Sequence, residues 1–220
     1  MRFGTFVGLE YGRLPGISVS AHKDFRQEIL FIDIGGSQES YFTWSNSETG
    51  SQFSKIDVIT ARSVPGNAED YVYMKRNEYK LIFRQLPHPE RGFTKILFVI
   101  GASLTCQYQV MEAFLDFLGE QWFARFGGNT NFTSGPKLFE SFDEDINLAF
   151  EMVPKDRIKT VQIQCRACNQ YFKVHVKKAL IDHASSFPVP LVFVHANHAL
   201  LIYIDQNYRS RGERIVNITG

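Results

Sequence analysis

Two short pairs of metal-binding side chains stand out in the sequence. Cys165 and Cys168 form a Cys-x-x-Cys motif, and after 26 intervening residues His195 and His198 form a second pair. Two thiolates and two imidazoles are a ligand set that tetrahedral zinc prefers. Four protein ligands leave no coordination position for water, so the pattern predicts a structural zinc site. The alternative is a reduced hairpin with two partly buried thiols, because Cys-x-x-Cys also occurs without metal in intracellular chains.

Other groups that could do chemistry give weaker signals. His195 beside one of the two thiols, with Asp205 orienting the imidazole, would make a metal- or thiol-dependent hydrolase. Cys106 lies at the start of a predicted helix among apolar and aromatic neighbours, which favours a small buried residue over a reactive thiol. The segment Ile32-Asp-Ile-Gly-Gly36 is not followed by a phosphate-binding motif, so we interpret it as a plain turn. No catalytic residue is assigned.

The composition is that of a globular protein from a reducing compartment. The chain has 220 residues, of which 44% are hydrophobic, enough for one sizeable core or two small ones. Three cysteines, an odd number, and a start without a charged and apolar leader predict a cytoplasmic protein without a disulfide framework. No segment approaches the roughly 20 consecutive apolar residues of a membrane span.

Charge is divided unevenly along the chain. Residues 155–220 carry ten Lys or Arg against four Asp or Glu, a balance of +6, which leaves −5 for the first 154 residues of a chain with net charge +1. Either the two parts attract each other, or the basic part meets an acidic partner such as nucleic acid or an anionic membrane. On the predicted long helix, Glu112, Asp116 and Glu120 form an acidic stripe, which we interpret as a solvated face.

Short segments rich in β-branched and aromatic residues fill the first part of the chain. They predict a mostly antiparallel sheet with strands at 4–9, 17–20, 29–34, 56–60, 71–74, 79–83 and 94–100. Apolar residues then recur at steps of three and four, which predicts a helix over 104–126. Ser103 or Thr105 would cap its start, and Gly127-Gly128 would end it in the left-handed conformation. The expected fold class is α+β, with the sheet packed against one long helix.

The chain is expected to divide into two units. The first covers 1–127, and a linker with a short helix at 142–153 covers 128–156. Residues 157–220 form a small basic β-rich unit with a hairpin around the Cys pair, a helix at 177–184 and strands at 189–195, 199–204 and 214–218. At roughly 60 residues this unit is marginal for a hydrophobic core alone, so a metal would help it to fold.

Two stretches resemble known families. Residues 71–126, three strands running through KILFVIGAS into an amphipathic helix, resemble the β-β-β-α portion of longin and roadblock-like domains. That resemblance implies a module that binds a small GTPase or assembles trafficking and signalling complexes. Residues 161–174, VQIQCRACNQYFKV, are similar to the first half of a zinc ribbon. The second Cys-x-x-Cys of that family is missing, so His195 and His198 would have to replace it.

The sequence as a whole favours a cytoplasmic, non-enzymatic protein-interaction module that docks its partners through a sheet edge or through the long helix. The runner-up is a zinc-dependent nucleic-acid-binding protein. In that interpretation, arginines of the basic unit contact phosphates and its aromatic residues stack on bases. These residues are Arg209, Arg211, Arg214, Tyr171, Phe172 and Tyr208. The hydrolase is the third interpretation.

Overall fold

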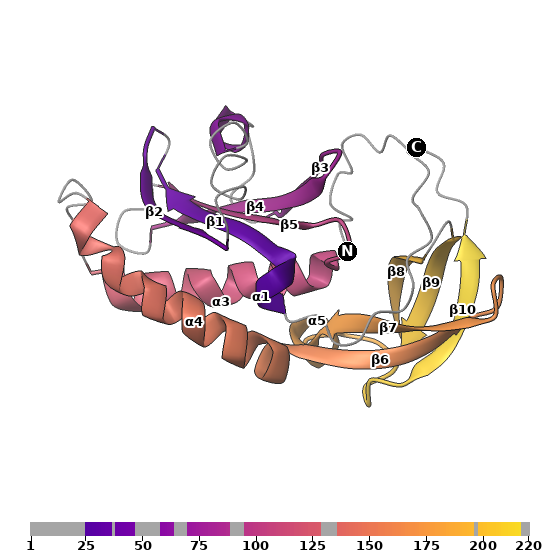
Figure 1. The fold of residues 1–220 in the computed structure, drawn as a ribbon. Helices are drawn as coiled ribbons and strands as arrows, with labels where there is room; N and C mark the ends of the chain where they lie inside the picture. The colour runs from indigo at the N-terminus through magenta and orange to yellow at the C-terminus, as the bar shows by residue number, and fades with distance from the viewer. Residues whose placement is uncertain are drawn as a thin grey trace.

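The structure confirms the α+β class. The computed structural model describes residues 25–36, 38–46, 58–63, 70–88, 95–128, 136–195 and 198–216, and the strands expected at 4–9 and 17–20 lie outside them. Along the chain, the described residues form first a five-stranded antiparallel sheet, then helices that pack on it, and last two smaller antiparallel sheets (Figure 1). No helix among the described residues is long and apolar enough to cross a membrane.

The large sheet has the strand order β2-β1-β5-β4-β3, and every neighbouring pair is antiparallel. Its central strand β5 (Lys95–Ser103) is the KILFVIGAS segment, and seven of its nine residues are buried. A continuous apolar run suits a strand that is covered on both faces. A tight turn joins β3 to β4, with the Arg76 N–H donating to the Tyr79 carbonyl at 2.8 Å. The other strands are β1 (Ile29–Gly35), β2 (Ser40–Ser45), β3 (Val72–Lys75) and β4 (Tyr79–Pro87).

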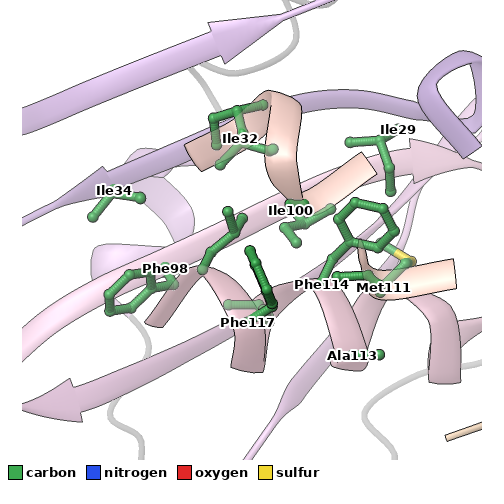
Figure 2. Packing of buried hydrophobic residues seen from close by; sticks show 14 of the residues in the cluster. Ile29, Ile32, Ile34, Phe98, Ile100, Met111, Ala113, Phe114 and Phe117 are labelled. Atoms are coloured by element: carbon green, nitrogen blue, oxygen red, sulfur yellow. The ribbon is translucent and has the colours of Figure 1, made fainter. Parts of the chain in front are cut away.

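Helix α3 (Tyr108–Phe126) covers one face of the large sheet, and α4 (Asp143–Met152) lies beside it (Figure 1). Figure 2 shows Ile32 and Ile100 of the sheet facing Phe114 of α3 in the main core. At the far end of the helix, Trp122 is fully buried and stacks on Phe139 with ring centroids 4.9 Å apart. The many phenylalanine residues of this sequence therefore mostly serve to fill a core.

The ends of α3 differ from the prediction. Gln107 is the N-cap residue and supplies no side-chain cap, while Ser103 and Thr105 share a hydrogen bond of 2.9 Å in the turn before it. At the other end Gly127 has a φ of −61°, which is right-handed. The periodic pattern located the helix body, but the terminal hydrogen bonds decide where it begins and ends.

The opposite face of the large sheet carries a short helix at 58–63, where the sequence predicted a strand over 56–60. That prediction is wrong. Val58 and Ala61 lie about one helical turn apart and pack with Phe31 and Val99 of the sheet. The β-branched residues of this segment favoured a strand, and packing on an apolar sheet face overrides such a preference.

The second unit begins with β6 (Ile158–Cys165) and β7 (Gln170–Lys177), which form the predicted hairpin around the Cys pair. Helix α5 (Lys178–Asp182) leads into a three-stranded sheet of order β10-β9-β8. Buried side chains of both sheets, such as Ile163, Val174 and Ile202, form a second core. The strands of the three-stranded sheet are β8 (Val189–His195), β9 (His198–Ile204) and β10 (Ser210–Val216).

Residues 136–158 pack on the main core. They include the predicted short helix, found as α4, and a π-helical turn η4 (Val153–Arg157). Phe142 and Ile146 are fully buried in the main cluster, to which Ile158 at the start of β6 also belongs. Val161, three residues further on, belongs to the second core. The change from one core to the other therefore falls inside β6, and the division into separately folding units stays a prediction.

The acidic stripe of α3 faces the second unit. Glu112 is only 9% exposed, so the interpretation of the stripe as a solvated face is wrong for this residue. Lys177 Nζ of β7 lies 2.5 Å from Asp116 Oδ2 and 3.8 Å from Glu112 Oε2. Arg157 forms a 2.5 Å ion pair with Glu120, nearer the surface. Some of the basic residues beyond residue 154 therefore pair with acidic residues of the long helix, so part of the uneven charge distribution is balanced within the chain.

Candidate functional site

Lys177 lies at the centre of a polar cluster between the two units. Its Nζ donates to the Tyr71 hydroxyl at 2.8 Å, and that hydroxyl donates to the Asp116 carboxylate. The Tyr73 hydroxyl donates to Glu112 Oε1 at 2.8 Å. Burial raises the pKa of both tyrosines, and the neighbouring carboxylates raise it further, so the phenols remain donors. These groups satisfy one another, which makes the cluster a joint between the units.

The two cysteines lie at the tip of the β6–β7 hairpin. Cys165 ends β6 opposite Gln170 and is fully buried, on the same face of the strand as Ile163. Cys168, in the turn, is half-buried and packs against the same core. Neither cysteine takes part in a disulfide. The hairpin therefore holds both thiols at one end of the second core.

The two histidines belong to a different hairpin. His195 is opposite His198 in the register of β8 and β9, and the side chains of both lie outside the described part of the structure. Arg166, in the cysteine turn, pairs with Glu213 of β10 at 2.7 Å, and Glu213 is beside Ile202 of β9. Ile202 is four positions from His198, roughly 13 Å along a strand. Each ligand pair is brought together by its own hairpin, and a zinc ion shared by all four residues stays a prediction.

Asp205 is occupied in a turn. Its Oδ1 accepts hydrogen bonds from the backbone N–H groups of Arg209 at 2.9 Å and Asn207 at 2.8 Å, and its Oδ2 accepts one from Arg211 Nε at 2.7 Å. These bonds, that from Arg209 first, hold the pKa of Asp205 below its usual value. The carboxylate thus stabilises the turn between β9 and β10, which gives it a structural role there.

The residues of the nucleic-acid interpretation have unequal exposure. Tyr208 packs against the second core, and its hydroxyl donates to Asp182 Oδ1 at 2.6 Å. Phe172 also packs against that core. Tyr171 is 55% exposed, so it is the aromatic member best placed to stack on a base. The exposed members of the set are Tyr171, Arg209, Arg211 and Arg214.

The three-stranded sheet turns an apolar face outward. Leu191 and Phe193 of β8 point into the second core, so the residues that alternate with them point away from it. Two of these outward residues, Val192 and Val194, are 52% and 63% exposed. The register continues this face across β9 and β10. We call it the outer face, and it consists of Pro190, Val192, Val194, Ala199, Leu201, Tyr203, Arg214 and Val216.

The composition of the outer face is unusual for an antiparallel sheet. Such a sheet commonly packs one face on a core and presents polar residues on the other. Strand β6 of the same unit follows this rule, with exposed Thr160, Gln162 and Gln164 alternating with buried apolar residues. The outer face instead carries a single charged residue, Arg214, on β10. Contiguous exposed apolar surfaces of this kind are typical of interaction sites, so the outer face is a candidate docking surface.

Sequence reasoning alone missed this surface, although its signal is visible. Residues 189–194 and 199–204 are uninterrupted apolar runs, VPLVFV and ALLIYI. A strand with one wet face should alternate between apolar and polar residues, so such runs predict burial on both faces. In the described part of the chain, Val192 and Val194 on the outer face are nevertheless more than half exposed.

Comparison with protein-family models gives no match to this chain, and no curated protein matches it.

Proposed function

We propose that the chain is a non-enzymatic protein-interaction module and that the outer face is its docking surface. The observation that carries the proposal is that Val192 and Val194 are each more than half exposed on a sheet whose inner face is packed. Covering the exposed half of each valine contributes about 1 kcal/mol. Arg214 gives the face a cationic rim, so the fitting partner is a protein with an apolar patch bordered by a carboxylate.

The large sheet supports the same class of function. Strands β3, β4 and β5 are followed by α3, which is the element order on which the resemblance to longin and roadblock-like domains rests. A small GTPase or a subunit of an assembled complex is accordingly the proposed partner. Eleven of the 19 residues of α3 are buried, so a sheet is a better docking element than the long helix.

Photo-crosslinking at two matched tyrosines tests the docking surface. Tyr203 lies on the outer face and Tyr171 on the exposed side of β7, so each is replaced in turn by a photoreactive phenylalanine derivative in the full chain. We expect irradiation in cells to couple position 203, but not position 171, to a second protein. Val192→Asp should abolish that coupling, because it places a charge on the outer face without touching the core.

Three results would contradict the proposal. Position 203 could couple to no protein, its coupling could persist with Val192→Asp, or it could couple to lipid. Coupling of position 171 to nucleic acid would instead put the runner-up first, and Arg209, Arg211 and Arg214 would then be the residues to replace next.

A further inference from the structure

The two edges of the three-stranded sheet are protected to different degrees. Native proteins blunt an exposed edge with charged side chains, bulges or proline. Strand β10 carries Arg211, Glu213 and Arg214, and its register with β9 shifts between Ser210 and Glu213. Strand β8 has no Asp, Glu, Lys or Arg among its seven residues, its one protecting residue is Pro190 near its start, and of the described strands it pairs with β9 alone. The β8 edge is therefore the one suited to accept a further strand.

Pro190 indicates which backbone groups of β8 face that edge. Proline has no N–H, and a sheet accommodates it where its nitrogen points away from the neighbouring strand. In an antiparallel pair, alternate residues point their N–H and C=O groups toward and away from the neighbour. Val192 and Val194 are in phase with Pro190, so their N–H and C=O groups point to the edge. The same two residues have the exposed side chains.

We propose that strand β8 of a second copy of this chain pairs with the β8 edge, antiparallel and across a two-fold axis. A register that sets Val192 opposite Val194 of the partner copy also sets Val194 opposite Val192, as two-fold symmetry requires. Each pair exchanges both of its backbone hydrogen bonds. On the outer face the side-chain contacts are valine against valine, β-branched pairs that suit a sheet, and on the core side Phe193 lies opposite Phe193 of the second copy.

Charge and size favour a second copy as the occupant. Because β8 has no charged residue, no like charges meet across the axis. The outer face of one copy measures roughly 300 Å², from strands about 4.8 Å apart and about 3.4 Å per residue. A stable interface needs about 800 Å² from each partner. Pairing at β8 makes one six-stranded sheet and joins two outer faces into a surface of roughly 600 Å², which comes closer to that area than one face does.

The dimer contact uses the β8 edge whereas docking uses the outer face, and only the argument from area rests on the proposed function. An edge contact of this kind buries less than a standard interface. We therefore expect a dissociation constant in the micromolar to millimolar range.

Opposite charges at the two paired positions test both the contact and its register. One variant changes Val192 and Val194 to Asp, and a second changes both to Lys. Sedimentation equilibrium of the full chain, from about 1 μM to about 1 mM, should show a dimer for the wild type. Each variant alone should be monomeric, because like charges face each other across the axis. An equal mixture should recover the dimer, since each Asp then faces a Lys.

A matched control comes from the other edge of the sheet. Ile215 on β10 is 53% exposed, and Ile215→Asp should dimerise like the wild type. Thermal unfolding midpoints close to that of the wild type will show that the variants are folded. A wild type that stays monomeric at every concentration overturns the inference, as does a dimer that survives both double substitutions. A mixture that fails to recover the dimer overturns the register. If the wild type is monomeric while position 203 still couples to a protein, the dimer is rejected and the proposed function stands.

Discussion

Replacing Lys177 by methionine should lower the free energy of unfolding by about 3 kcal/mol. The lysine side chain is 10% exposed, and its Nζ lies 2.5 Å from Asp116 Oδ2 and 2.8 Å from the Tyr71 hydroxyl. Removing one partner of a buried ion pair costs about 3–5 kcal/mol, because the remaining charge is buried without compensation. Methionine keeps most of the apolar part of the lysine side chain, so the decrease in the free energy of unfolding measures the effect of the missing charge.

Three features of the structure place the loss at the lower end of that range. Arg84 remains 3.1 Å from Asp116 Oδ1, so this carboxylate keeps a cation. Burial raises the pKa of Glu112 and Lys177 opposes that shift, so without the lysine Glu112 takes up a proton more readily. The backbone N–H of residue 177 still donates to Gln109 Oε1 at 2.9 Å.

Urea unfolding at pH 7 measures the loss as a lower midpoint with an unchanged slope. Lys159→Met is the matched control, because Lys159 is exposed on β6, and it should change stability by less than about 0.5 kcal/mol. In an Asp116→Asn background Lys177→Met should cost at least about 1 kcal/mol less, since residues in contact couple. A loss below about 1 kcal/mol, or equal losses in the two backgrounds, would refute a stabilising role for the pair.

Three further outcomes are expected. Gly101→Ala should lower the unfolding free energy by about 1–3 kcal/mol in a thermal melt, because the new methyl group would overlap the buried Phe31 ring; an unchanged melt contradicts this packing. Asp205→Asn should destabilise the protein near neutral pH. The folded-state pKa of Asp205 is held below the usual 3.8, so its stabilisation is present above that pH and is lost as the pH falls through the lowered pKa. The difference in Tm between wild type and variant should therefore shrink in acid, and a constant difference speaks against it. If zinc is bound, a chelator or Cys165→Ser should unfold the second unit and leave α3 intact, whereas a zinc-free protein whose Tm ignores both excludes the metal.

Local sequence patterns predicted the elements whose stabilising contacts join residues that are close in sequence. The three- and four-residue spacing of apolar side chains located α3, and turn residues between two β-rich segments located the β6–β7 hairpin. The helix at 58–63 escaped prediction because its conformation is set by the sheet beneath it. Intrinsic secondary-structure propensity describes a segment in isolation. Here the contacts with the sheet determine the conformation of the segment.

The candidate functional surfaces were harder to predict because their residues are distant in sequence. Glu112 looked solvated until Lys177, 65 positions away, was found beside it. The positions of Cys165 and Cys168 at a hairpin tip could be predicted, but the relation of that tip to the β8–β9 hairpin depends on how two sheets pack. The outer face could have been recognised from its unbroken apolar runs, since alternation is what an antiparallel strand with one wet face requires.

Amide hydrogen exchange along β8 tests the proposed pairing most directly. From the position of Pro190 we infer that Leu191 and Phe193 point their N–H groups toward β9, whereas Val192 and Val194 point theirs to the edge that no described strand covers. In the 15N-labelled full chain, the amides of Leu191 and Phe193 should be protected at every concentration. Protection of Val192 and Val194 should be absent in dilute solution and should appear as the concentration rises into the range where the dimer forms. Protection of all four amides at the lowest concentration, or exchange of Val192 and Val194 that never slows, would contradict an open β8 edge that a second copy completes.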